Sequence, residues 1–261
     1  MRKDIEPKRS VSMEASITLG YAFDLGGGYT IKPPTVRQVI EYGQSDYYRL
    51  VGLLTAISSD CKAALEDMGI DWCKVGNFEM FIMATRALSA DESSILFEPA
   101  IDFTALEFYA NDSGGAELRD CQGNVVIDEA RQQIISTFLC KLHNIRKKPE
   151  FPSNDFARMM LLEESRMEAA ATKGRADRDV LFPLISFVAN APGSKYDYAT
   201  SLDLPISTFM DCVSRLRIID EASALRSACY NGWVDTSKLD KKLLNVFREI
   251  EPPKPKEVIK T

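Results

Sequence analysis

Hydrophobic and polar positions change their period along the chain, and each period predicts a different kind of element. Residues 16–32 place β-prone side chains on both sides of Gly26-Gly27-Gly28. This pattern predicts a β-hairpin rather than a phosphate-binding loop, because extended residues and not a helix follow the glycines. From Thr35 the apolar positions recur every three or four residues, which predicts helices over 36–42, 46–57, 59–68 and 78–88. Ser89 and Glu92 then have the spacing of a capping box, so another helix is expected to begin there.

Strand signals return between residues 101 and 127. Three short runs, 103–109, 116–119 and 125–127, are separated by turns rich in Gly, Asn and Asp. This arrangement predicts a small antiparallel meander. Asp128 is placed to cap a helix that continues to about residue 145.

Two prolines, Pro149 and Pro152, break the helical pattern and mark a predicted domain boundary. Every strong signal beyond them is helical, over 154–173, 179–190, 205–218, 221–231 and 238–250, and residues 251–261 form a Pro/Lys tail that we expect to be flexible. We therefore predict an α+β protein that is mainly α. Its N-terminal domain (1–150) combines short helices with a small antiparallel β part, and its C-terminal domain (151–250) is all-helical.

Composition narrows the classes of partner and compartment. The 261 residues include 38 acidic and 32 basic side chains, for a net charge of −6. This balance disfavours nucleic acid as a partner, because phosphate backbones are bound by basic surfaces. The amino terminus lacks the apolar run of a signal peptide, and no run of about 18 apolar residues long enough to span a membrane occurs. We expect a cytoplasmic protein without membrane contact, whose six scattered cysteines are reduced.

Candidate chemistry is sparse, because His143 is the only histidine. One imidazole is too few for a multi-histidine metal site, and we predict no metal, no cofactor and no catalytic residue. His143 lies at the end of the helix predicted from Asp128, where a histidine commonly caps the helix or faces solvent. The catalytic alternative is a Cys140–His143 pair on one helix face, but the sequence supplies neither an orienting group nor an oxyanion site for it.

Three further groups of residues have a structural interpretation beside a functional one. The basic run 141–148 could contact phosphate, but such runs are typical of a solvated helix end. The carboxylate pairs could act as acid–base couples, but they are typical of first turns and exposed helix faces: Asp91-Glu92, Glu163-Glu164 and Asp220-Glu221. Aromatic residues of the C-terminal half are expected in the core or, in loops, as anchors of a protein interface: Tyr196, Tyr198, Phe209, Tyr230 and Trp233.

Several short segments stand in a characteristic order along the chain. In the C-terminal half these are 181–190 (LFPLISFVAN), 195–198 (KYDY), 203–211 (DLPISTFMD) and 232–235 (GWVD). In the N-terminal half the segments are 69–72 (GIDW), 78–81 (FEMF) and 101–103 (IDF). Together they resemble the tail assembly chaperone-like proteins of long-tailed (siphovirus-type) bacteriophages, over about residues 30–250.

The resemblance implies a non-enzymatic chaperone. Such a protein binds the tape measure protein and helps recruit tail-tube subunits in the host cytoplasm, and the resemblance identifies no partner-binding residues. One alternative is a structural tail or neck component that stays in the virion. A third hypothesis, a cytosolic hydrolase that uses Cys140 and His143, follows from the residues alone. The sequence leaves a homo-oligomer open.

Overall fold

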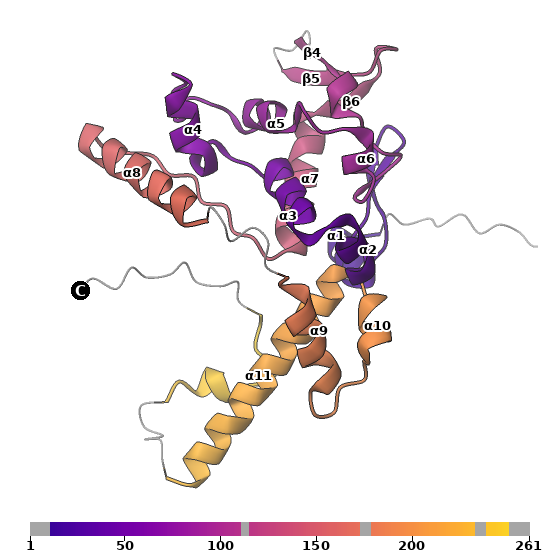
Figure 1. Ribbon diagram of the computed structural model, residues 1–261, viewed down its shortest axis with the longest axis vertical. Coiled ribbons are helices and arrows are strands. Elements are labelled where there is room, and N and C mark those ends of the chain that lie inside the picture. The colour runs from indigo at the N-terminus through magenta and orange to yellow at the C-terminus, as the bar shows by residue number, and fades with distance from the viewer. Residues whose placement is uncertain (1–10, 111–114, 173–178, 233–238, 251–261) are drawn as a thin grey trace, which may run out of the picture.

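Helices dominate the structure. The described residues of the computed structural model, 11–110, 115–172, 179–232 and 239–250, form eleven α-helices and two small antiparallel sheets of three strands each (Figure 1). The predicted fold class, α+β and mainly α, is therefore confirmed. Trp233 and the tail 251–261 lie outside the described residues.

The first sheet is built on the glycine turn. Strands β1 (Phe23–Gly26) and β2 (Tyr29–Ile31) form the predicted hairpin, and β3 (Phe97–Glu98) pairs with β2. Gly27 has a φ of +66°, and a Cβ there would lie 2.8 Å from Nη2 of Arg131. That guanidinium is fixed, because it donates to the carbonyl oxygens of Leu25, Val125 and Val126. The turn thus requires a residue without a side chain.

The segment before the hairpin is a helix and not the predicted strand. Helix α1 (Met13–Leu19) begins at the Ser12 cap and ends at Gly20, whose φ is +74°. It packs against α7 (Glu129–Leu142) and α11 (Ile206–Tyr230). The hydroxyls of Ser207 and Thr208 donate to two α1 carbonyl oxygens at 2.6 and 2.8 Å. These tertiary contacts outweigh the β preference of the apolar residues in this segment.

The helices predicted between residues 35 and 93 are present with shifted boundaries. They are α2 (Val36–Tyr42), α3 (Gln44–Leu54), a 3-10 turn (Ser58–Cys61), α4 (Lys62–Asp67), α5 (Asn77–Thr85) and α6 (Ala90–Ser93). The capping box of Ser89 and Glu92 at the start of α6 is confirmed. A second box, formed by Thr35 and Gln38, begins α2.

The second sheet has the predicted meander order. Its strands are β4 (Glu107–Ala110), β5 (Ala116–Arg119) and β6 (Val125–Asp128). β5 is the central strand and pairs antiparallel with both β4 and β6. Residues Phe103–Ala105 form a 3-10 turn instead of the start of a strand. Asp128 caps α7 as predicted, and this helix ends at Leu142 rather than near residue 145.

Four helices make up most of the C-terminal half: α8 (Asp155–Thr172), α9 (Leu181–Asn190), α10 (Tyr198–Leu202) and α11. The separate helices predicted over 205–218 and 221–231 are one helix, because no glycine or proline interrupts α11. A helix over 238–250 was also predicted, but residues 239–250 contain only the 3-10 turn Lys241–Leu244. Backbone carbonyl oxygens of this segment accept instead from two arginines of α11, Arg215 and Arg226.

The main core runs through both halves of the chain. Ile31 and Phe138 belong to the same buried cluster as Ile185 and Phe209. Two backbone hydrogen bonds join the halves, from the Val36 amide to the Leu204 carbonyl and from the Ile206 amide to the Pro34 carbonyl, at 3.0 and 2.8 Å. The domain boundary at Pro149–Pro152 stays a prediction, and the packing on either side of it is continuous between residues 25–142 and 181–213.

A second, smaller cluster lies under α8. Its buried members are Ala56, Leu65, Trp72, Met80 and Leu162. Figure 1 shows α8 beside α4 at the edge of the molecule, and the two helices pack together. Three ion pairs fasten α8: Arg158 with Glu66 and Asp71, at 2.6 and 3.1 Å, and Arg166 with Asp67 at 2.6 Å.

Candidate functional site

His143 occupies the predicted position at the end of α7, but it is half-buried and neutral rather than a solvated cation. Its Nε2 lies 2.8 Å from the Tyr47 hydroxyl, and its ring contacts the edges of Tyr47 and Tyr48. Burial lowers the pKa of His143 from 6.5 to about 4. The unprotonated Nε2 of a neutral imidazole can accept a hydrogen bond from the Tyr47 hydroxyl, whereas an imidazolium cannot. This histidine therefore serves packing within the fold.

Cys140 lies on the same helix and lines an open cavity of about 460 Å³ at the end of α7. Other lining residues are Ile57, Asn77, Ser136 and Lys147. Burial raises the pKa of the Cys140 thiol, so the thiol is protonated at neutral pH. The hydrogen bonds of the described residues join His143 to Tyr47 and not to Cys140. The geometry therefore gives no support to a Cys140–His143 nucleophile–base pair.

The basic run 141–148 is partly neutralised by the fold. Lys141 Nζ lies 2.6 Å from a carboxylate oxygen of Glu14, and Lys147 Nζ lies 2.6 Å from one of Asp60. Arg146 and Lys148 are exposed. The two paired lysines hold α1 and the 3-10 turn before α4 against the end of α7, which is a structural role.

The three carboxylate pairs lie in different environments. Glu92 belongs to the capping box and pairs with Arg49 at 2.8 Å, and Glu221 pairs with Arg248 at 2.5 Å. Glu163 and Glu164 are both exposed on α8, and no ion pair joins them to another described residue. The described part of the chain also contains no group of three or more His, Cys, Asp or Glu side chains suited to a metal ion.

The aromatic candidates divide between core and surface. Phe209 is fully buried in the main core, and Tyr196 packs against it. Tyr198 is exposed, with its hydroxyl 3.2 Å from Ser186 Oγ and from Asn190 Nδ2. Tyr230 is exposed at the end of α11. Phe209 and Tyr196 thus have the core positions that the first of the two interpretations predicts. Tyr198 and Tyr230 have exposed rings that a partner could contact.

A broader apolar surface lies on α8, where the sequence had indicated only a helix. Four large side chains, which we call the methionine face, are 52–67% exposed: Phe156, Met159, Met160 and Met167. Their spacing of i, i+3, i+4 and i+11 places them on one side of the helix. The opposite side carries Leu161 and Leu162, which pack on the second core cluster. Helix α8 is therefore apolar on two faces, and only one of them is covered by described residues.

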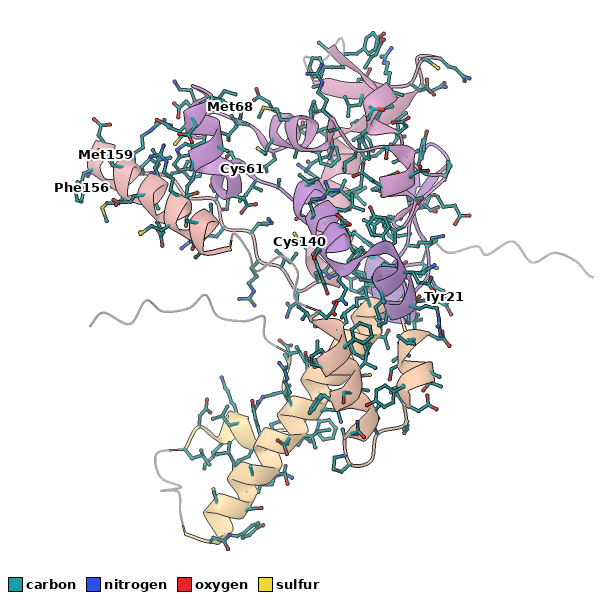
Figure 2. All side chains as sticks on the ribbon, in the orientation of Figure 1. Tyr21, Cys61, Met68, Cys140, Phe156 and Met159 are labelled. Carbon is teal, nitrogen blue, oxygen red and sulfur yellow. The ribbon has the colours of Figure 1, made fainter. Side chains whose placement is uncertain are left out.

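Two more large apolar side chains are exposed before α8 and at the end of the neighbouring α4. Phe151 before α8 and Met68 after α4 are 72% and 64% exposed. Figure 2 shows Phe156 and Met159 at the end of α8 that lies farthest from the main body of the molecule, and Met68 at an end of the neighbouring α4. Exposed apolar side chains that share one face of a helix, as the four of the methionine face do, mark interaction sites on proteins. The methionine face is the best candidate functional site.

Comparisons with known protein families, with curated proteins and with solved structures find no match for the chain. Among the described helices, none combines the length and the apolar character needed to cross a membrane. The candidate site is thus characterised by its own geometry: an apolar helix face with one exposed carboxylate, that of Glu163, within it and another, that of Glu164, next to it.

Proposed function

We propose that this protein is a non-enzymatic tail assembly chaperone of a long-tailed bacteriophage. In this proposal it binds the tape measure protein in the host cytoplasm and helps recruit tail-tube subunits around it. The ordered sequence segments between residues 69 and 235 support the family, and the methionine face of α8 supports the mode of action.

The exposure of the methionine face is the observation that carries the proposal. A chaperone for a long, aggregation-prone polypeptide needs an apolar surface that remains exposed while its own chain stays folded. Methionine suits that task, because its unbranched and polarisable side chain adapts to partners of different shape. The covered face of α8 keeps the helix in place, and the outer face is left to contact a partner.

Co-expression with the tape measure and tail-tube proteins of one phage tests this function. We expect the tape measure protein to become more soluble and to copurify with the chaperone. The control is the same co-expression with a cytoplasmic protein of similar size and charge. If neither tail protein copurifies, the proposed function is wrong.

Mass spectrometry of purified virions tests the alternative of a structural tail or neck component. A chaperone acts during assembly and is absent from the finished particle. Detection of the chain in virions at a stoichiometry fixed relative to the tail-tube protein would favour the structural component instead.

A further inference from the structure

We propose that the methionine face of α8 binds a cationic amphipathic helix, with its apolar side on Phe156, Met159, Met160 and Met167 and its basic side on Glu163 and Glu164. This inference rests on the proposed function, which it deepens by naming the surface and the chemistry of the partner. It is argued from the distribution of charge on α8 and from the shape of the exposed face.

The arginines of α8 are paired with acidic residues of the neighbouring segment, whereas Glu163 and Glu164 are exposed on its outer side. Both arginines of α8 form ion pairs with residues of α4 or of the segment that follows it: Arg158 pairs with Glu66 and Asp71, and Arg166 pairs with Asp67. The carboxylates of Glu163 and Glu164 are exposed, and no ion pair of the described residues neutralises them. The outer side of the helix therefore combines apolar side chains with two carboxylates that no described residue neutralises.

Glu163 lies within the methionine face and not beside it. It follows Phe156 at i+7 and precedes Met167 at i+4, so it projects from the same side of the helix. Glu164 lies next to this stripe. A partner that covers the face must therefore desolvate or closely approach these carboxylates, and this costs free energy unless the partner supplies cations. Lysine or arginine beside an apolar stripe fulfils that requirement.

The shape of the face favours a helix as the occupant. The apolar side chains form a stripe along α8, an 18-residue helix of about 27 Å. A second amphipathic helix packs along such a stripe by placing its own apolar residues between the exposed side chains. Methionines at three of the four positions allow the face to accept different apolar side chains.

A second copy of this chain fits the face less well. Pairing two methionine faces would gather four carboxylates, Glu163 and Glu164 from each copy, around the middle of the interface. Like charges brought close together in an interface repel each other, and this disfavours the pairing of two copies. An anionic membrane surface is disfavoured for the same reason, because interfacial helices bind lipid through basic polar faces.

The test uses the full chain and a fluorescent helical peptide of 18 residues, with leucines at i, i+3, i+4 and i+7 and lysines on both flanks. The control peptide carries glutamate at every lysine position. We expect the lysine peptide to bind, the glutamate peptide to bind about tenfold or more weakly, and added salt to weaken the lysine complex. Anisotropy titration measures the dissociation constants.

Variants assign the binding to this face. Met160→Ser with Met167→Ser removes apolar contacts, and Glu163→Gln with Glu164→Gln removes charge. Each pair is expected to weaken binding about tenfold. Matched controls lie elsewhere: Met83→Ser on α5 and Glu41→Gln on α2, both exposed. They should leave the dissociation constant unchanged, and thermal unfolding should show that every variant is folded.

Four results would overturn the inference. These are absence of binding by the lysine peptide, equal binding by both peptides, equal binding by the α8 variants and the wild type, and a dimer in light scattering that the α8 variants convert to monomer. The last result would make a second copy the occupant. The inference and the proposed function fail separately. If tail proteins copurify equally with the α8 variants, only the inference is wrong, and if the peptide binds but no tail protein copurifies, only the proposed function is wrong.

Discussion

His143 links the stability of the fold to pH, because burial favours its neutral form. Its pKa is 6.5 in an exposed chain and about 4 in the fold. As the pH falls below 6.5, the unfolded chain binds a proton on His143 before the folded chain does. The free energy of unfolding therefore decreases progressively until about pH 4. The difference in pKa corresponds to about 3 kcal/mol at most.

The His143→Gln variant isolates this contribution, since glutamine is neutral at every pH and can still accept a hydrogen bond from Tyr47. We expect the wild type to lose more stability than the variant between pH 6.5 and 4, as measured by urea midpoints. Parallel pH profiles of the two proteins would show that His143 is not held in its neutral form.

Gly27 and Gly28 offer a second comparison at the scale of single residues. Both have positive φ, +66° and +85°, but only at Gly27 would a Cβ meet another side chain, Arg131. Gly28→Ala should cost about 1 kcal/mol from backbone strain alone. Gly27→Ala should cost about 2 kcal/mol, because it also displaces a guanidinium that donates to three carbonyl oxygens. Equal losses in chemical denaturation would contradict the fixed position of Arg131.

At the scale of elements, the two faces of α8 predict opposite effects of mutation. Leu162 is buried in the second core cluster, so Leu162→Ala should cost about 2–3 kcal/mol and loosen α8. Met160→Ala on the outer face should change stability by less than about 0.5 kcal/mol. Hydrogen exchange of the α8 amides distinguishes the two. Similar protection in both variants would mean that α8 does not depend on its inner face.

Helix α8 also shows where prediction from the sequence ends. Its periodicity predicts a helix, and the structure confirms it over Asp155–Thr172. However, both the Leu161-Leu162 side and the Phe156-Met159-Met160 side have the spacing of a core face. Which side is buried depends on α4 and Trp72, which come much earlier in the chain. The candidate site could therefore not be located before the packing was known.

Local signals were reliable where caps and turns dictate the backbone. The box at Ser89, the glycine turn and the Asp128 cap are all local, and each begins or joins the element that it predicted. The predictions of secondary structure were wrong where contacts with residues distant in the sequence determine the conformation. Ser207 and Thr208 donate hydrogen bonds to carbonyl oxygens of the helix 13–19. Arginines of α11 donate to carbonyl oxygens within residues 244–248. No pattern within a short window reports such partners.

At the scale of the whole molecule, the shared core predicts cooperative unfolding of both halves. Phe209 is fully buried and belongs to the same cluster as Phe138 and Ile31. Phe209→Ala should therefore cost about 3–5 kcal/mol, and probes in both halves should report the same shifted transition. Trp72 fluorescence in a Trp233→Phe background reports on the N-terminal half, and far-UV circular dichroism reports on all helices.

Separate transitions would change this picture. If Phe209→Ala lowered the stability of the C-terminal helices but left the Trp72 transition in place, the predicted domains 1–150 and 151–250 would unfold independently. The backbone hydrogen bonds between residues 34–36 and 204–206 would then contribute little to the coupling.

The hydrogen bonds between α1 and the start of α11 also set the time at which the protein can complete its fold. The hydroxyl of Ser207 and the Ile17 carbonyl that it contacts are 190 residues apart. At a synthesis rate of 5–20 residues per second, a ribosome needs about 10–40 s to make the chain between them. For most of that time α2 has been made but lacks α10 and α11, two of the helices that pack against it in the finished structure. The nascent chain therefore exposes part of its main core until the final long helix has emerged.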